Sequence, residues 1–545
     1  MKEMKLREKI GQMIMTGFPA AQITPDLMHL IEDYKVANII LFSYNVCTNE
    51  QISGNCRFLH RKIEEATGFP AFIAIDQEGG VVTRLPKNSC NVPGAMLIGA
   101  TGDEKNAYRA GVITGAELRA IGINMDLAPV LDVNSNPDNP VIGTRSYSSE
   151  VSVVERFGRN MIKGLQHEKV LPTAKHFPGH GDTAVDSHLG LPVVEKDLSQ
   201  LRELELIPFQ SAVDQGIPCV MTSHILFPKL EKEHVPATMS KSILTGLLRE
   251  EMGFQGIIIT DCLEMGAIVN NYGTAKAAVE AIKAGAQLLC ISHTPALVIE
   301  AIQRIEEAVQ TGEIPISMID DAVTNILKYK EQYKPSLEEE QEKQPGSGMH
   351  NSSGASLPLE EEQEEPFDRG AFRKEIENMA LSGITKVSEG QLPEISKQTV
   401  FLGCYAYRST LVTSAVNKEL HFAKYMAEKL GCRWIDVPLN PTQEEIDAIV
   451  RQLADVGSVV YGLYNGHLNH GQIRLARKLD DSGKAVTAVA LRNPYDLAFL
   501  GGKIHKIAAY EYNETVFDAL LGILTKDAAA VGKLPVELVE GRNIE

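Results

Sequence analysis

The segment Gly256–Met265 reads GIIITDCLEM, an apolar run of strand length that closes on an aspartate. Its isoleucines are β-branched and uninterrupted by charge, which is typical of a strand buried on both faces. Asp261 is then the first charged side chain that such a strand can present at its C-terminal end.

Six further runs of this kind occur in the first half of the chain. They are Val36–Phe42, Ala71–Asp76, Asn124–Asp132, Pro172–Phe177, Cys219–His224 and Gln287–Ser292. Helical patterns lie between them, for example at Asn106–Ala120, Val151–Gln166, Leu198–Asp214 and Lys241–Met252. Alternating strands and helices predict a parallel sheet. The length of this region favours a (β/α)₈ barrel of the TIM type.

Several of these runs end in a chemically active side chain. Asp76, Lys175, His176, His224 and Asp261 each lie at or near the C-terminal end of an expected strand. Barrel enzymes carry their active sites at this end of the strands. A single polar strand end would mean little, but the recurrence of Asp, Lys and His predicts a site.

The second half of the chain predicts a smaller α/β domain of the αβα sandwich type. Its expected strands are Thr399–Tyr405, Ser458–Tyr464, Ala485–Leu491 and Ile507–Tyr512, and its expected helices include Ser409–Leu430 and Gln443–Leu453. The segment 336–366 is rich in Glu, Gln, Ser and Gly and cannot bury a core of its own. We therefore expect a barrel at 1–335, an acidic linker at 336–366 and the second domain at 367–545.

Bulk properties favour a cytoplasmic enzyme that binds neither nucleic acid nor membranes. The net charge is −18, much of it in the linker, and no apolar run is long enough to span a bilayer. The N-terminal residues have no signal-peptide pattern, and Lys5–Met15 instead predicts a first amphipathic helix. None of the eight cysteines forms a C-x-x-C pair, so we expect reduced, mostly buried thiols.

The loop after Pro172–Phe177 holds the densest group of ionisable residues. Lys175–Pro192 reads KHFPGHGDTAVDSHLGLP, and its glycines and prolines indicate a loop. Asp186 and His188 are close enough in sequence for the carboxylate to orient the imidazole and raise its pKa, which suits proton transfer near neutral pH. At the end of the apolar strand in Gly256–Met265, a buried Asp261 could attack an anomeric carbon.

Two further motifs carry candidate ligands for sugar hydroxyls. Ala74–Leu85, AIDQEGGVVTRL, contains Asp76 and Arg84, and Asn139–Tyr147, NPVIGTRSY, contains Arg145. Both motifs include glycine turns.

Together these motifs resemble glycoside hydrolase family 3, in its β-N-acetylglucosaminidase branch. The resemblance runs from Leu6 to about Lys334 and rests on KHFPGHGDT, the following D-S-H, and TDCLEM. It implies that Asp261 is the nucleophile and that His188, paired with Asp186, is the acid/base. It also implies that the terminal GlcNAc is bound by Asp76, Arg84, Arg145, Lys175 and His176. Val81 departs from the branch, which often has Arg there.

The resemblance implies a retaining β-N-acetylglucosaminidase that needs no cofactor or metal. The expected substrates are small carbohydrates, GlcNAc-MurNAc or GlcNAc-anhydroMurNAc fragments from cell-wall turnover in peptidoglycan recycling, with chitin oligomers as another possibility.

Three other functions are compatible with the residues. Phosphorolysis by the same fold would follow if phosphate replaced water, because His188 is not an anionic carboxylate. A metal-dependent hydrolase would use His176, His180, Asp182, Asp186 and His188 as ligands. A sugar sensor without catalysis would fit two lobes joined by a linker.

Single residues also have structural alternatives. Asp261 could instead cap a helix, Asp132 could cap a turn, and Glu78 is expected to be structural.

Overall fold

The computed structural model describes residues 4–184, 190–335, 367–408, 410, 413–414 and 417–539. Its first unit is an eight-stranded parallel sheet in the order β7-β6-β5-β4-β3-β2-β1-β8. The strands are β1 Ile14–Thr16, β2 Asn38–Leu41, β3 Phe72–Ile75, β4 Met125–Asp126, β5 Leu171–Phe177, β6 Cys219–Thr222, β7 Ile257–Ile259 and β8 Leu289–Cys290. A parallel bridge between Ile259 and Leu288 joins the two ends. The expected barrel is therefore confirmed.

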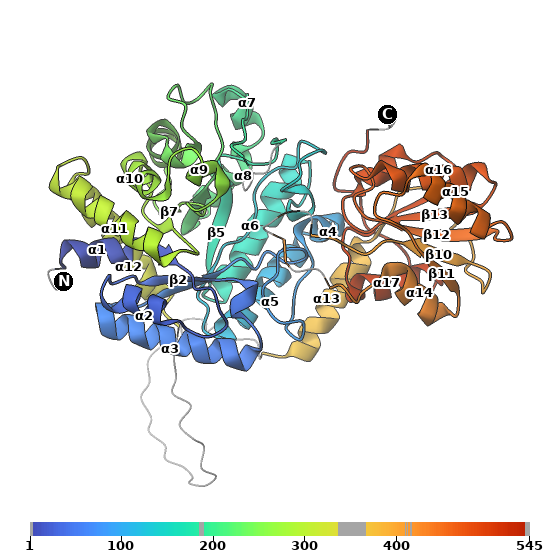
Figure 1. Ribbon diagram of the computed structural model, residues 1–545, viewed down its shortest axis with the longest axis horizontal. Helices are drawn as coiled ribbons and strands as arrows, with labels where there is room; N and C mark the ends of the chain where they lie inside the picture. The colour runs from blue at the N-terminus through green and yellow to red at the C-terminus, as the bar shows by residue number, and fades with distance from the viewer. Residues whose placement is uncertain are drawn as a thin grey trace, which may run out of the picture.

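Helices surround this sheet (Figure 1). They are α1 Leu6–Gln12, α2 Pro25–Glu32, α3 Asn49–Thr67, α4 Ala95–Ala100, α5 Lys105–Ala120, α6 Val151–His167, α7 Leu198–Glu203, α8 Leu206–Asp214, α9 Gly266–Val269, α10 Thr274–Ala284, α11 Pro295–Gln310 and α12 Ile316–Gln332, with a π-helix at Ser242–Glu251. Among the described residues, no helix has the length and apolar character to cross a membrane.

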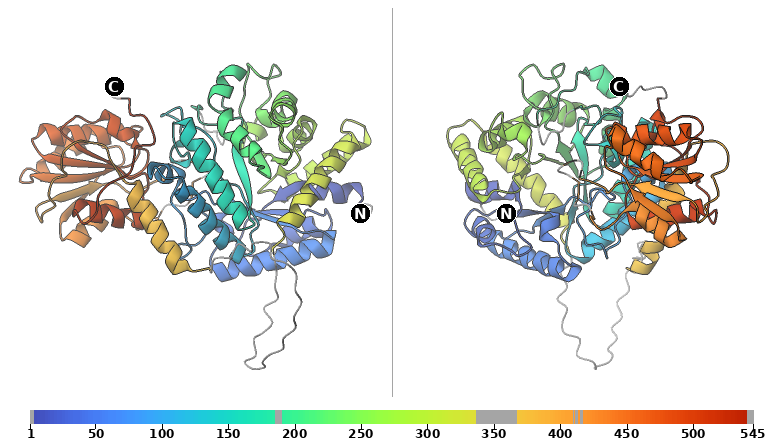
Figure 2. Two further views of the ribbon diagram at one scale, coloured as in Figure 1. Left: turned by 180° about the vertical axis from the view of Figure 1, so that it is seen from behind. Right: turned by 45° about the vertical axis from the view of Figure 1, so that its right-hand side comes forward.

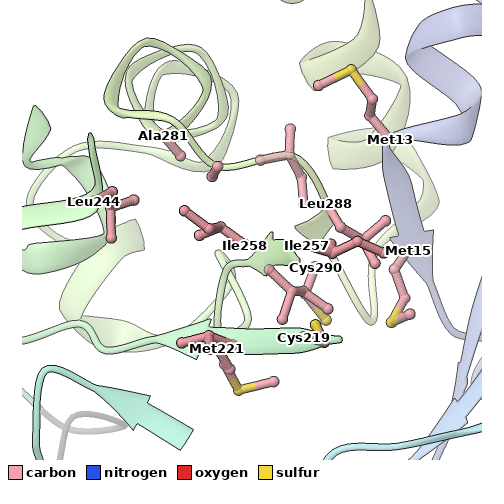
Figure 3. Close-up of a cluster of buried hydrophobic side chains, with 14 of the residues drawn as sticks. Met13, Met15, Cys219, Met221, Leu244, Ile257, Ile258, Ala281, Leu288 and Cys290 are labelled. Carbon is pink, nitrogen blue, oxygen red and sulfur yellow. The ribbon is translucent and has the colours of Figure 1, made fainter. Parts of the chain in front are cut away.

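The barrel core is apolar on both sides of its strands. Ile257 and Ile258 of β7 lie among Cys219, Met221 and Cys290, as the close-up in Figure 3 shows. Residues of this kind leave water as the strands pair, and their burial supplies the main driving force for closing the sheet.

The second unit is a six-stranded sheet in the order β11-β10-β12-β13-β14-β9, with β9 antiparallel to β14 and the other pairings parallel. Its strands are β9 Thr385–Lys386, β10 Val400–Gly403, β11 Arg433–Asp436, β12 Ser458–Leu463, β13 Ala485–Ala490 and β14 His505–Ala508. Helices α15 Gln443–Gln452 and α16 His470–Asp481 cover one face, and α14 Phe422–Leu430 and α17 Glu514–Leu524 cover the other (Figure 1). This confirms the expected α/β sandwich.

The two units are joined by α13 Arg369–Gly383, which lies between them (Figure 2). Phe372 and Ile376 of α13 join a barrel-side core, whereas Met96 and Leu97 of α4 join the core of the second sheet. The hydrophobic cores thus interlock across the junction. The domain boundaries at 335 and 367 remain a prediction.

Several expected elements are wrong in their bounds. The strand expected at Asn124–Asp132 is limited to β4, Met125–Asp126, and the helix expected at Leu198–Asp214 is divided into α7 and α8. The helix expected at Lys5–Met15 ends at Gln12, and Ile14–Thr16 forms β1 between β2 and β8. The helix expected at Ser409–Leu430 begins only at Phe422, where His421 caps it by accepting a hydrogen bond from Lys424 N at 3.2 Å. In the segment Lys5–Met15, Met13, Ile14 and Met15 continue the apolar pattern past the point where the backbone changes conformation.

Candidate active site

A cavity of about 450 Å³ opens at the C-terminal ends of the barrel strands. Six of the residues predicted for the site line it, namely Asp76, Arg84, Arg145, Lys175, His176 and Asp261. Asp76 directly follows β3, Lys175 and His176 lie near the end of β5, and Asp261 lies just beyond β7. Parallel strand ends meet at one rim of a barrel, so residues far apart in sequence converge here.

A buried carboxylate holds two cations in place on one side of the cavity. Glu78 Oε1 lies 2.6 Å from Lys175 Nζ, and both carboxylate oxygens accept from Arg145, at 2.7 and 2.8 Å. Lys175 Nζ also donates to Asp76 Oδ1 at 2.7 Å. Glu78 was expected to be structural. It also fixes the positions of two of the predicted binding residues, Lys175 and Arg145.

The opposite charges in this cluster stabilise each other's ionised forms. Burial opposes ionisation of Glu78, but the Arg145 and Lys175 charges outweigh it and hold the Glu78 pKa well below its usual range. Burial likewise opposes the charge on Lys175, yet Asp76 and Glu78 raise the Lys175 pKa. Glu78, Lys175 and Arg145 therefore stay charged across the neutral range, as polar recognition of sugar hydroxyls requires.

A second carboxylate, Asp132, orients the histidine loop. Its Oδ2 accepts from His176 Nδ1 at 2.7 Å, and its Oδ1 accepts from the backbone N–H of His180 at 2.7 Å. His180 Nδ1 lies 2.8 Å from Thr183 Oγ1. Burial, followed by the nearby His176, lowers the His180 pKa to about 4. His180 is therefore neutral at physiological pH, and Asp132 fixes both the His176 ring and the loop backbone at His180.

Asp261 lies just beyond the end of β7, lines the cavity and is partly exposed. Its Oδ1 accepts from Cys262 N at 2.7 Å, and the Cys262 carbonyl in turn accepts from His224 Nε2 at 3.0 Å. The following helix, α9, begins at Gly266 with Met265 as its N-cap. Asp261 thus does not cap that helix, which removes the structural alternative considered for it.

The second half of the chain also reaches this cavity. Arg84 Nη1 donates to Ser414 Oγ at 3.0 Å, and Arg408 and Thr413 are lining residues. Burial lowers the Arg84 pKa, and the Arg145 and Arg408 charges act in the same direction. No motif in the sequence pointed to Arg408, which lies more than a hundred residues from every predicted site residue.

Another part of the cavity wall is aromatic. Phe42 stacks on Tyr44 with ring centroids 5.4 Å apart and lies 4.8 Å from the His293 ring. Tyr44 Oη is 3.2 Å from His293 Nδ1, and Glu264 Oε1 accepts from His293 N at 2.7 Å. Aromatic faces of this kind are suited to the apolar face of a sugar ring.

The predicted acid/base pair, Asp186 and His188, lies outside the described residues. Of the other ligands suggested for a metal, Asp182 pairs with Lys196 at 3.0 Å, while His176 and His180 bond to Asp132 and Thr183. Over the ranges that the structure covers, no three His, Cys, Asp or Glu side chains gather as a metal site would require.

Comparison with known proteins agrees with this geometry. Residues 5–329 match the model of the glycosyl hydrolase family 3 N-terminal domain. The chain is 31% identical to β-hexosaminidase A of Pseudoalteromonas piscicida, over 94% of this chain and 91% of that protein. It is similar to the structure of a glycoside hydrolase family 3 β-N-acetylglucosaminidase from Paenibacillus sp. str. FPU-7, with 35% identity, a TM-score of 0.86 and coverage of 99% and 100%.

Proposed function

The chain belongs to glycosyl hydrolase family 3 and is a β-hexosaminidase of that family, and we propose that it removes terminal β-linked GlcNAc with retention of configuration. In this proposal Asp261 is the nucleophile, and His188, oriented by Asp186, is the acid/base. The observation that carries it is the placement of Asp261 in the same cavity as the five predicted sugar-binding residues.

The surroundings of Asp261 support its role as nucleophile. The Cys262 N–H donates to one carboxylate oxygen and so fixes the orientation of the Asp261 carboxylate in the cavity, where a sugar's anomeric carbon would be placed. Attack would form a glycosyl-enzyme intermediate and expel the aglycone. His188 in its protonated form would donate to the glycosidic oxygen, and once neutral it would take a proton from the water that releases the sugar.

The charged cluster supports binding of the terminal sugar. Asp76 would accept hydrogen bonds from sugar hydroxyls, while Lys175, Arg145 and Arg84 would donate to hydroxyl or acetamide oxygens. Because Glu78 already fixes Lys175 and Arg145, little ordering entropy is lost when the sugar enters. His176, held by Asp132, completes this donor set.

We propose further that the aglycone is a muramyl or anhydromuramyl residue, as in fragments from cell-wall turnover. Arg84 and Arg408 both line the cavity, and their charges repel each other. The lactyl carboxylate of a muramyl group would relieve this repulsion. Changing Arg408→Gln should therefore raise KM for a GlcNAc-muramyl substrate at least ten-fold and leave KM for a neutral chitin disaccharide within two-fold. Equal effects on both would contradict the muramyl assignment.

The catalytic assignments are tested by hydrolysis of an aryl β-GlcNAc glycoside by the wild type, Asp261→Asn and His188→Ala, with EDTA present. We expect an active wild type and variants slowed by at least a hundred-fold. Loss of wild-type activity in EDTA would favour a metal site instead. The products are analysed with and without phosphate, because formation of GlcNAc 1-phosphate would identify phosphorolysis.

A further inference from the structure

The cavity wall beside Asp261 contains a second nucleophilic group. Cys262, Cys290 and His293 all line the cavity, at the C-terminal ends of the adjacent strands β7 and β8. Leu263 N donates to the Cys290 carbonyl at 2.8 Å, and Cys290 N donates to Thr260 Oγ1 at 3.0 Å, so the two backbone segments are directly paired. The Cys262 thiol interacts with Cys290 and His293.

The surroundings of Cys262 differ from those of the deeply buried thiols. Hydrogen bonds from Cys290, and then from His293 and Ser292, lower the Cys262 pKa well below its usual range despite burial. By contrast, burial raises the pKa of the Cys56, Cys219 and Cys404 thiols to about 12. Reactive cysteines occur where a thiolate is stabilised by a neighbouring imidazolium and remains accessible.

Cys262 is also accessible, and a neighbouring thiol can form a disulfide with its oxidised sulfur. Cys262 lines the cavity and is partly exposed, whereas Cys290 is buried, with its Sγ 3.1 Å from Ser292 Oγ. A reactive, accessible thiolate poised next to a second cysteine is the arrangement found in reversible redox sites.

We propose that Cys262 is a peroxide-reactive thiol that Cys290 converts to a disulfide, and that this modification reversibly inactivates the glycosidase. None of the catalytic roles proposed above uses either sulfur. The oxidation itself stands without those roles, while the loss of activity rests on Asp261 being the nucleophile.

The chemistry balances with hydrogen peroxide as the oxidant. The Cys262 thiolate attacks one peroxide oxygen, an S–O bond forms as the O–O bond breaks, and the departing hydroxide takes a proton from His293 to leave as water. Cys290 then attacks the Cys262 sulfur, the S–S bond forms as the S–O bond breaks, and a second water leaves with the Cys290 proton. Two thiols and one peroxide thus give one disulfide and two waters.

Inactivation follows from the position of the Cys262 backbone. The same residue gives its N–H to Asp261 Oδ1, and its carbonyl accepts from His224. Drawing its sulfur into a bond with Cys290 displaces this donor and alters the cavity wall. A misplacement of about 1 Å at a reacting group costs about a hundred-fold in rate.

The test treats the full-length protein with hydrogen peroxide and measures both intact mass with peptide mapping and hydrolysis of an aryl β-GlcNAc glycoside. The wild type should lose two mass units, acquire a Cys262–Cys290 cross-linked peptide and lose at least ten-fold in activity, and dithiothreitol should restore it. Cys290→Ser should instead gain oxygen at Cys262. After peroxide treatment, Cys262→Ser should be as active as the same variant before treatment. Cys47→Ser, a change at an exposed thiol, should behave as the wild type.

A second measurement does not depend on the cysteine variants folding. In the wild type, iodoacetamide should alkylate Cys262 at pH 7 at least ten-fold faster than Cys47, and His293→Gln should abolish this difference. The proposal is overturned if Cys262 remains fully alkylatable after peroxide treatment, or if Cys262→Ser loses as much activity as the wild type. A cross-linked but fully active enzyme would retain the thiol chemistry and reject the inactivation, whereas the assignment of Asp261 as nucleophile is tested separately by Asp261→Asn.

Discussion

Lys175 Nζ lies 2.6 Å from Glu78 Oε1 within the barrel, and both side chains are almost completely buried. This ion pair connects the strand that opens the histidine loop with the loop after β3. Because Glu78 also holds Arg145, one carboxylate determines where two cations face the substrate cavity.

Replacing this carboxylate should affect both stability and binding. Glu78→Gln keeps the shape but leaves two buried cations without their shared counter-charge, so the free energy of unfolding should fall by about 3 kcal/mol. KM should rise at least ten-fold because Lys175 and Arg145 lose their fixed orientation. Denaturant unfolding and steady-state kinetics measure both effects. The matched control is Glu65→Gln at an exposed ion pair, and equal behaviour of the two variants would contradict the account.

The contact between Asp132 and His176 predicts a loss of sugar affinity. Asp132→Asn removes the charge that orients the imidazole, so binding of GlcNAc, measured by calorimetry, should weaken at least ten-fold. Asp103→Asn, at an exposed position, serves as the control. If the Asp132 variant binds GlcNAc as tightly as the wild type, His176 does not contact the sugar.

Glu511 should make stability depend on pH. This buried residue of the second unit accepts from Gly94 N, and burial raises its pKa to about 7 from a usual 4.5. Between those values the folded state holds a proton that the unfolded state has released, so the contribution of Glu511 to stability falls as pH rises. The wild type should lose roughly 3 kcal/mol relative to Glu511→Gln between pH 4.5 and 7. A pH-independent difference between the two proteins would refute this.

Tyr495 of the second unit should help to hold the barrel segment near Asp132 in position. Asn134 Nδ2 donates to Tyr495 Oη at 2.7 Å, and Asn134 lies two residues beyond Asp132. Tyr495→Phe should lower the free energy of unfolding by about 1 kcal/mol and reduce kcat/KM several-fold. Tyr425→Phe makes the same change at a bond to Asp518 within the second unit and should not alter kcat/KM. Identical kinetics of the two variants would argue against such support.

The sequence predicted most of the fold because buried parallel strands leave a clear apolar signal. β3, β5 and β7 lie within the expected runs or differ from them by one residue. β1 was missed because Met13, Ile14 and Met15 continue the apolar pattern of the preceding helix. The short edge strand β11 was missed because its four residues are mostly exposed and form no apolar run.

Site residues at the ends of apolar strands could be predicted from the sequence. Site residues whose position depends on contacts between distant segments were harder to predict. Asp76 and Asp261 stand at the ends of apolar runs, which marks them in the sequence. Glu78 looks like an ordinary loop carboxylate and Asp132 like a strand-end residue that caps a turn, because the cations and the ring that they hold are distant in sequence. Arg408 reaches the cavity only through the packing of the second unit on the barrel.

Covalent trapping tests the central claim most directly. A 5-fluoro glycosyl fluoride of GlcNAc reacts rapidly with a retaining enzyme but is released slowly, so the intermediate accumulates and its peptide can be sequenced by mass spectrometry. The account predicts one adduct, on Asp261, and none in Asp261→Asn. An adduct on any other residue, or active turnover with inversion and no adduct, would contradict Asp261 as the nucleophile.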